Sequence, residues 1–338
     1  MTNQADTSEK IAVIGLGFVG LPLAGTFAEI GMTVTGIDKH PVVLESLKNG
    51  KSHFEEFGLQ ELLDRQLGKN LTITDSLEPG AHDTYVIAVG TPVDPATRKP
   101  IMEYVESASR GVGAILKKGD LVIMRSTVPV GITREIVLPA LEEESGLKVE
   151  QDFDLVFAPE RLVAGRALQE LRELPQIIGG VHSEANIDRA ITLFKKLTPE
   201  IVRVESLESA EMAKIIDNSY RDLTFAYANQ MALLCEKIGI NMNELAGAVN
   251  LNYKRNHVPR PSPGVGGTCL TKDPYILMQF GEKYGYVPPL AKVARDINES
   301  MTHHVADKAC RLLTEAGKDP KESTVLVLGD AFKGKPVT

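Results

Sequence analysis

The chain has 338 residues, 43% of them hydrophobic and 24% charged, a composition typical of a globular protein with room for two domains. Its net charge of −8 and its lack of a dense basic run argue against a nucleic-acid partner. No apolar run approaches the ~18 residues of a membrane span, and three widely spaced cysteines argue against disulfides and a metal site, so we expect a cytoplasmic protein.

A glycine-rich turn follows the first predicted strand. Residues 11–14 are an apolar strand, residues 15–20 read Gly-Leu-Gly-Phe-Val-Gly, and a helical pattern runs from 21 to about 30. Glycines let backbone N–H groups approach a pyrophosphate at a helix N-terminus. The turn therefore predicts a dinucleotide contact by these residues: Gly15, Gly17, Phe18, Val19 and Gly20.

The second predicted strand, residues 33–37, ends at Asp38, 18 residues after Gly20. An acid at this position accepts the ribose hydroxyls, and its charge repels the 2′-phosphate of NADP. The order of strand, glycine turn, helix and acid predicts NAD as the cofactor. A plain βαβ turn without a ligand is the alternative.

Strands and helices alternate as far as residue 205, which predicts an α/β fold with a doubly wound parallel sheet of the Rossmann type over residues 1–205. Further strands are predicted at 71–73, 84–89, 120–125, 154–157, 176–178 and 201–203, with helices at 102–116, 133–144 and 183–196. Polar loops around Thr91, Thr127 and Glu160 follow three of these strands. Because the carboxyl ends of parallel strands meet at one edge, we expect these loops to line one crevice.

Residues 206–317 predict an all-α domain, with helices at 208–237, 241–250, 273–284 and 290–314. The first helix is long for one domain, and the apolar surface it exposes predicts a homodimer. Lys214 and Asn218 lie one turn apart on it, either as a solvated surface pair or as part of a site. Residues 324–329 predict a buried strand that starts a third domain over 318–338.

Cys269 follows a glycine run and precedes Lys272 and Asp273. A nearby cation favours the thiolate, and the glycines allow close approach of a ligand. The segment predicts a nucleophilic thiol, and a small buried side chain is the alternative.

Taken together, the motifs resemble those of the nucleotide-sugar 6-dehydrogenases, the group that oxidises UDP-glucose, UDP-N-acetylmannosamine or GDP-mannose. The matching motifs are the glycine turn at 15–20, Ser-Thr-Val-Pro-x-Gly at 126–131, Pro-Glu-Arg at 159–161, Lys-x-x-x-Asn at 214–218, and Gly-Gly-x-Cys-x-x-Lys-Asp at 266–273. Five motifs in one order cover nearly the whole chain.

The resemblance implies that the C6 hydroxyl of a sugar nucleotide is oxidised to a carboxylate with two NAD and one water. Cys269 would form a thiohemiacetal and then a thioester. Lys214 and Asn218 would stabilise the oxyanion, while Glu160, Thr127 and Asp273 would activate water or move protons. The residues implied to contact the substrate are Glu160, Arg161, Lys214, Asn218, Tyr253, Arg255, Gly266 and Lys333.

At residues 160–161 and 165–168 the resemblance is to the branch that uses a UDP-N-acetylhexosamine, and it implies a substrate such as UDP-N-acetylmannosamine, with UDP-glucose as the alternative. Family members continue as a second Rossmann-like domain, of which this chain holds the predicted first strand, so we expect weak sugar-nucleotide binding and low turnover. Two other functions stay open. A 3-hydroxyacid or 6-phosphogluconate type dehydrogenase would need no cysteine, and an NAD-binding scaffold would need no catalysis.

Overall fold

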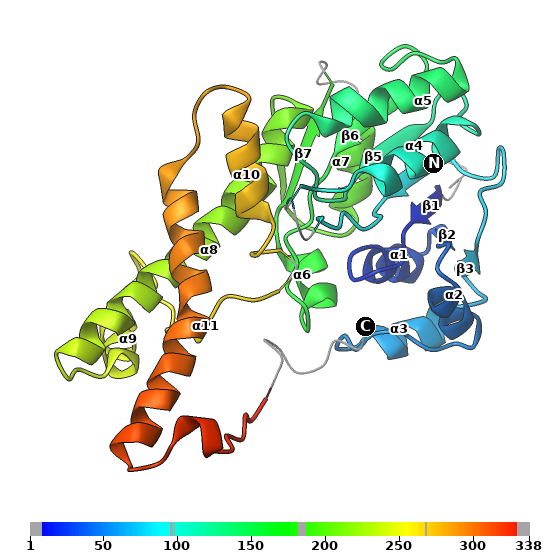
Figure 1. The fold of residues 1–338 in the computed structure, drawn as a ribbon. Coiled ribbons are helices and arrows are strands. Elements are labelled where there is room, and N and C mark those ends of the chain that lie inside the picture. The colour runs from blue at the N-terminus through cyan, green and yellow to red at the C-terminus, as the bar shows by residue number, and fades with distance from the viewer. Residues whose placement is uncertain (1–8, 95–96, 98, 182–186, 268, 330–338) are drawn as a thin grey trace. The chain divides into compact units, whose positions relative to one another are not determined.

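A computed structural model describes residues 9–94, 97, 99–181, 187–267 and 269–329 (Figure 1). These residues fall into two compact units, and the chain passes from the first to the second within helix α8 (Leu207–Lys237), between Lys214 and Ile215. Nowhere in these ranges does a helix combine the length and the apolar character that a bilayer span requires.

The first unit is built on an eight-stranded sheet with the order β3-β2-β1-β4-β5-β6-β7-β8. Its strands are β1 (Lys10–Ile14), β2 (Thr33–Ile37), β3 (Leu71–Thr74), β4 (Thr84–Ile87), β5 (Leu121–Met124), β6 (Asp154–Phe157), β7 (Gln176–Gly180) and β8 (Ile201–Val204). All neighbours are parallel except β6 and β7. The first six strands have the doubly wound order, which confirms the predicted fold class, and the order reverses between β1 and β4, where such sheets bind ligands.

Helices cover both faces of this sheet because successive strand residues point to opposite sides. Along β1, Ile11 and Val13 pack in one cluster with the helices α1, α3 and α7, whereas Ala12 and Ile14 pack in another with α4 and α5. The helices are α1 (Gly20–Glu29), α2 (Pro41–Lys48), α3 (Leu59–Gln66), α4 (Glu103–Gly113), α5 (Leu138–Ser145), α6 (Ala167–Glu173) and α7 (Asp188–Lys195), and a π-helical turn (Thr133–Val137) leads into α5.

Three of these helices, α2, α3 and α6, were not predicted from the sequence. They have only 8, 8 and 7 residues, so each shows barely two turns of apolar periodicity. The antiparallel entry of β7 was not predicted either. Because β7 starts at the edge of the sheet where β6 ends, the connection through α6 does not cross the sheet as it would between parallel strands.

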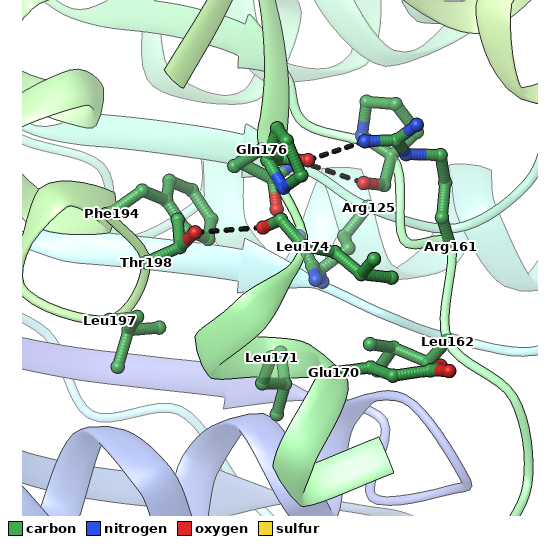
Figure 2. A pocket seen from close by; sticks show the side chains of 12 residues that line it. Arg125, Arg161, Leu162, Glu170, Leu171, Leu174, Gln176, Phe194, Leu197 and Thr198 are labelled. Carbon is green, nitrogen blue, oxygen red and sulfur yellow. Dashed lines mark hydrogen bonds between the residues drawn. The ribbon is translucent and has the colours of Figure 1, made fainter. Parts of the chain in front are cut away.

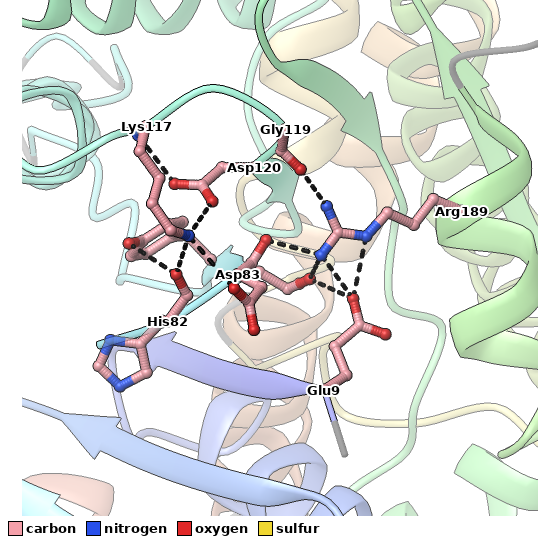
Figure 3. Close-up of polar contacts among 9 residues, drawn as sticks. Glu9, His82, Asp83, Lys117, Gly119, Asp120 and Arg189 are labelled. Carbon is pink, nitrogen blue, oxygen red and sulfur yellow. Dashed lines mark hydrogen bonds and ion pairs between the residues drawn. The ribbon is translucent and has the colours of Figure 1, made fainter. Parts of the chain in front are cut away.

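An ion-pair network ties together the amino ends of β1, β4 and β5 (Figure 3). The guanidinium of Arg189 on α7 donates to Glu9 at 2.8 Å and to the carbonyl oxygens of Gly119 and Asp83 at 2.5 and 2.8 Å. Lys117 pairs with Asp120 at 2.5 Å. The network lies at the edge opposite to the carboxyl ends of these parallel strands, so it serves the stability of the sheet rather than ligand binding.

The second unit is helical. It contains the part of α8 (Leu207–Lys237) from Ile215 onward, followed by α9 (Met242–Asn250), α10 (Asp273–Glu282), α11 (Pro289–Glu315) and a short 3₁₀ turn (Pro320–Glu322). The side chain of Asn241 caps α9 by accepting N–H bonds from Asn243 and Glu244. The predicted helical middle region is therefore confirmed, with helix ends within two residues of the predicted positions.

The predicted buried strand at residues 324–329 is wrong. The segment has no strand structure, and the side chains of Val325 and Leu328 are 57% and 87% exposed. Its apolar composition suits a buried strand, but a strand forms only when its backbone pairs with a neighbour. Among the described residues of this unit, no other strand offers that pairing.

Candidate active site

The glycine turn after β1 has the geometry that a dinucleotide requires. Gly15 has a φ of +92°, and its N–H bonds to the Ile37 carbonyl at 2.8 Å, so the turn packs against the end of β2. A Cβ at Gly20 would lie 1.8 Å from the Gly15 oxygen. At Gly17, by contrast, no described residue other than its immediate neighbours in sequence lies within 4 Å of the corresponding position, which leaves its backbone open to a pyrophosphate.

Asp38 is oriented by the same turn. Its Oδ2 accepts the Leu16 N–H at 2.8 Å, and its Oδ1 accepts the His40 N–H at 2.8 Å. The carboxylate therefore stands beside the glycine turn, at the position from which an acid accepts ribose hydroxyls. The ring of Phe18, which is 43% exposed, packs 4.2 Å from that of Phe54. These residues fit NAD.

Two alanine substitutions separate the roles of these glycines. We expect Gly17→Ala to fold normally but to lose at least about tenfold in NAD affinity, because its methyl group occupies the approach of the pyrophosphate. We expect Gly20→Ala to lower the thermal midpoint as well, because its methyl group overlaps the backbone of Gly15. Calorimetric NAD titration and thermal unfolding of both variants measure the difference, and equal NAD affinity of Gly17→Ala and wild type would contradict it.

Two strand-end loops are tied to each other at the carboxyl edge. The hydroxyl of Thr91, after β4, donates to the Thr127 carbonyl at 2.8 Å, and the hydroxyl of Ser126 donates to the Val89 carbonyl at 2.7 Å. The structure thus brings Thr91 and Thr127 together. The sequence predicted this only from the rule that the carboxyl ends of parallel strands meet at one edge of a sheet.

Glu160, in the loop after β6, forms a buried ion pair with Lys214 on α8. Lys214 Nζ lies 2.9 Å from Glu160 Oε1, and Oε2 accepts the Leu162 N–H at 2.7 Å. Burial alone would raise the pKa of Glu160, but Lys214, the Leu162 N–H and Arg125 outweigh it and hold the pKa below its usual value. Glu160 is therefore an anion at neutral pH.

Arg125 stabilises the loop that carries Glu160 by hydrogen bonds to neighbouring residues; Figure 2 labels Arg125 and Gln176. Arg125 is fully buried, and its Nη1 donates to the Ala158 carbonyl and to Gln176, both at 3.0 Å. Gln176 in turn donates to the Pro159 carbonyl at 2.9 Å. Burial lowers the pKa of Arg125 to about 10, so the side chain stays charged at pH 7. Two buried cations therefore flank one carboxylate.

Arg161 lies beside this support and lines the same small cavity, of about 20 Å³ (Figure 2). Its guanidinium donates to the Pro175 carbonyl at 2.5 Å. Arg161 directly follows Glu160, and this hydrogen bond holds its guanidinium against the chain.

Glu211 on α8 holds the loop that carries Thr127. Its carboxylate accepts the N–H groups of Gly131 at 2.6 Å and Thr133 at 2.9 Å, and the Thr133 hydroxyl at 2.5 Å. Burial raises the pKa of Glu211 to about 7, although these donors favour the ionised form. The helical periodicity of residues 208–237 did not single out this side chain.

The raised pKa makes the contribution of Glu211 to stability depend on pH. Between its ordinary pKa of 4.5 and about 7, the folded state binds more protons than the unfolded state, so stability falls as the pH rises. The full effect is about 3 kcal/mol at 1.36 kcal/mol per pKa unit. We therefore expect the free energy of unfolding of Glu211→Gln to rise relative to that of wild type as the pH increases from 5 to 8.

Glu208→Gln is the matched control for this experiment. Hydrogen bonding to Arg134 lowers the pKa of Glu208, so its contribution is lost only as the pH falls below its ordinary range. Because the charge of Glu208 is a minor cause of the raised pKa of Glu211, its difference from wild type should change much less from pH 5 to pH 8 than that of Glu211→Gln. A Glu211→Gln difference that is equally flat would show that Glu211 is ionised throughout.

In the second unit, three other predicted residues meet. Asn218 Nδ2 donates to Asp273 Oδ2 at 2.6 Å, and Lys272 Nζ lies 3.5 Å from Asp273 Oδ1. All three side chains are buried. Cys269 is exposed, and its carbonyl accepts the N–H groups of Lys272 and Asp273 at 3.1 and 2.9 Å, so the thiol precedes α10 by one turn.

The remaining predicted substrate contacts are scattered. Tyr253 and Arg255 are exposed in the loop after α9, where the guanidinium lies 5.8 Å from the tyrosine ring centre. Gly266 is exposed in the loop before Cys269. Lys333 lies outside the described residues. Within the described ranges, no group of three or more His, Cys, Asp or Glu side chains is arranged to hold a metal.

Most of the sequence matches two family descriptions that follow one another along the chain. Residues 9–198 match the NAD-binding domain of the UDP-glucose/GDP-mannose dehydrogenase family, and residues 208–300 match its central domain. The chain belongs to the UDP-glucose/GDP-mannose dehydrogenase family. The predicted family, the NAD cofactor and the assignment as a nucleotide-sugar dehydrogenase are thereby confirmed.

Relatives in this family share about a third of the sequence. The UDP-N-acetyl-D-mannosamine dehydrogenase of Campylobacter jejuni is 33% identical over 330 residues, covering 96% of this chain and 79% of that protein. The structure of a UDP-D-ManNAc dehydrogenase from Pyrococcus horikoshii superimposes with a TM-score of 0.87 at 35% identity, covering 93% of this chain and 74% of that one.

The alternative of a 3-hydroxyacid dehydrogenase is supported by fold alone. The 3-hydroxyisobutyrate dehydrogenase of Mycobacterium tuberculosis superimposes with a TM-score of 0.63 over 88% of this chain and 94% of that one, but is only 19% identical. This chain therefore shares its fold with that enzyme, and the match carries no argument about function.

Proposed function

We propose that this dehydrogenase oxidises the C6 hydroxyl of a UDP-N-acetylhexosamine, such as UDP-N-acetylmannosamine, to the uronic acid through a covalent adduct on Cys269. UDP-glucose is the alternative substrate. The names of the two UDP-N-acetylmannosamine dehydrogenases described above support the N-acetylhexosamine. The observation that carries the thiol route is that Cys269 is exposed one turn before the buried group of Asn218, Lys272 and Asp273.

NAD, when bound, accepts one hydride in each of two oxidations. In the first, the C6 alcohol loses a proton to a basic group of the chain and becomes an aldehyde. The Cys269 sulfur then adds to the aldehyde carbon, which gives a thiohemiacetal. Loss of the second hydride gives a thioester, and water releases the acid and regenerates the thiol.

The charged side chains serve this sequence at different points. Lys214 and Asn218 stabilise the oxyanion of the tetrahedral adducts by charge and by N–H donation. Glu160, which is anionic beside Lys214, orients or deprotonates the water, together with Thr127. Asp273 moves protons near Asn218. Arg161, Tyr253, Arg255, Gly266 and Lys333 contact the sugar nucleotide.

The domain organisation that accompanies this proposal has an NAD-binding domain over 1–205, a helical domain with the nucleophile over 206–317, and the start of a sugar-nucleotide domain over 318–338.

Incubation with NAD and a panel of UDP-sugars tests the function. We expect two NADH for each sugar oxidised and a uronic acid product, with UDP-N-acetylmannosamine preferred. One NADH for each sugar and an aldehyde product would rule out the thioester route.

We propose that the chain forms a homodimer through α8. Large exposed apolar side chains follow one face of the helix at spacings of four and seven residues: Ile216, Tyr220, Tyr227 and Leu234. This spacing is typical of a helix that packs against another helix. Sedimentation of wild type and Leu234→Glu tests the interface, since the charged variant should be monomeric where the wild type is dimeric.

A further inference from the structure

A buried polar network in the second unit holds one end of the segment that carries Cys269. Arg295 on α11 and Asp222 on α8 are 2% and 0% exposed. The Arg295 Nη1 donates to Asp222 Oδ1 at 2.7 Å and to the carbonyl of Leu270 at 3.2 Å. Leu270 directly follows Cys269, so the guanidinium fixes the peptide next to the thiol.

The same network holds the other end of the segment. Asn229 on α8 accepts the N–H of Ser262 at 2.8 Å and donates to Asn298 at 2.9 Å. Asn298 in turn donates to Asp222 Oδ1, also at 2.9 Å. Residues 262 and 270 are thus anchored to one set of connected side chains on α8 and α11.

The chain between the two anchors needs such support. It contains three glycines, at 264, 266 and 267, whose backbones lose the most conformational freedom when they are ordered. Gly264 packs against α11, since a Cβ there would lie 3.1 Å from Thr302 Cγ2. The anchors therefore limit where the glycine-rich segment can place the thiol.

The arrangement of charges also indicates a role beyond stability. Replacing a buried ion pair by apolar side chains of similar volume is often neutral or stabilising. Arg295 is further oriented by Glu299, whose Oε1 accepts its Nη2 at 3.3 Å and the hydroxyl of Tyr275 at 2.7 Å. Two helices and the end of the thiol segment thus converge on one planar guanidinium, which offers several donors in a fixed geometry.

We propose that Asp222 and Arg295 are positioning residues for Cys269: they hold the Leu270 peptide and thereby direct the thiol for attack on the substrate aldehyde. The inference deepens the proposed function and depends on Cys269 as the nucleophile. The proposal does not place Asp222 or Arg295 in contact with substrate or cofactor.

The test measures alkylation of Cys269 by iodoacetamide in the full chain without substrate, by mass spectrometry, with the exposed Cys310 as an internal standard. We expect Arg295→Lys to lower the rate ratio of Cys269 to Cys310 at least about threefold, because the thiol would lose its fixed place one turn before α10, and a helix N-terminus generally favours a thiolate. A ratio that is unchanged or higher would overturn the inference.

Two further variants separate positioning from folding. The double variant Asp222→Leu/Arg295→Met replaces the pair by apolar side chains, so it should fold and yet show the lowered ratio. Lys292→Ala removes an exposed ion pair with Asp296 on the same helix and should leave the ratio unchanged. If the double variant melts like wild type and keeps the wild-type ratio, the network has no positioning role.

A second readout follows the reaction. The Arg295→Lys variant should keep the first oxidation but release aldehyde, which lowers the yield from two NADH for each sugar towards one. The alkylation ratio is independent of this chemistry. If Cys269→Ser still makes acid, the proposed thiol route is wrong, whereas the alkylation ratios measured for the Arg295 variants are unaffected. If the Arg295 variants keep both the wild-type alkylation ratio and the full yield of NADH, only the positioning inference is wrong.

Discussion

The variant Cys269→Ser is expected to lose uronic acid formation by on the order of 10³-fold or more, because a hydroxyl is a far weaker nucleophile than a thiol near neutral pH. The first oxidation, from alcohol to aldehyde, needs no sulfur and should survive in part. Product analysis by mass spectrometry, with hydroxylamine added to trap the aldehyde, separates the two oxidations.

Cys310→Ser is the matched control, because Cys310 is also exposed but lies on α11 outside the motif. It should keep wild-type product formation. Acid formation by Cys269→Ser at a rate within tenfold of wild type would exclude a thioester and would favour direct oxidation of a hydrated aldehyde.

The second large effect is expected from Lys214→Met. This change leaves the buried Glu160 carboxylate without its partner at 2.9 Å, at a cost of about 3–5 kcal/mol in the free energy of unfolding. The charge of Arg125 offsets part of this cost. Loss of an oxyanion donor should also lower kcat by about 10²–10³-fold. Thermal unfolding and steady-state kinetics measure the two effects.

The effect on stability should depend on pH in a defined direction. The pKa of Glu160 is lowered in the folded wild type, so its contribution is present above the unfolded pKa and is lost as the pH falls through the folded value. In Lys214→Met, burial instead favours the protonated acid. The gap between the two proteins should therefore widen from pH 4 to pH 7.

The double variant Glu160→Gln/Lys214→Met serves as the control for this prediction. It removes both charges, so it should regain much of the stability that Lys214→Met loses, but not the activity. If Lys214→Met is as stable as wild type at pH 7, the ion pair is open to solvent in solution.

The sequence predicts the parts of this fold that depend on local patterns. The strand pattern around residues 11–14, the glycine turn and Asp38 at the next strand end specify a Rossmann sheet and its cofactor, because each depends on a few neighbouring residues. The long helix was equally clear, since it has 31 residues and its interior lacks glycine and proline.

The supporting contacts of the site were not predictable in this way. Glu211 meets Thr133 across 78 residues of sequence, and Arg125 meets Gln176 across 51. Neither pair has a spacing or periodicity that marks it. One signal was present: Arg125 directly follows the apolar run 121–124, and a charged side chain that ends a buried strand needs a partner in the interior.

The misassigned segment at 324–329 shows the limit of composition. Val-Leu-Val-Leu at 325–328 has the β-branched and apolar residues of a strand, but nothing in the segment itself states whether another strand is alongside. Pairing is a property of the whole chain, so the same residues lie exposed here.

That exposed segment is also expected to affect how the protein behaves at high concentration. An uncharged run of alternating valine and leucine with open backbone groups is the kind of sequence that stacks into intermolecular cross-β ribbons. Besides the proposed interface on α8, concentrated samples are therefore expected to have a second route to larger particles, which Leu234→Glu leaves open. A lysine in place of Val327 would interrupt this second route, so that light scattering of the two variants distinguishes ordered assembly from precipitation.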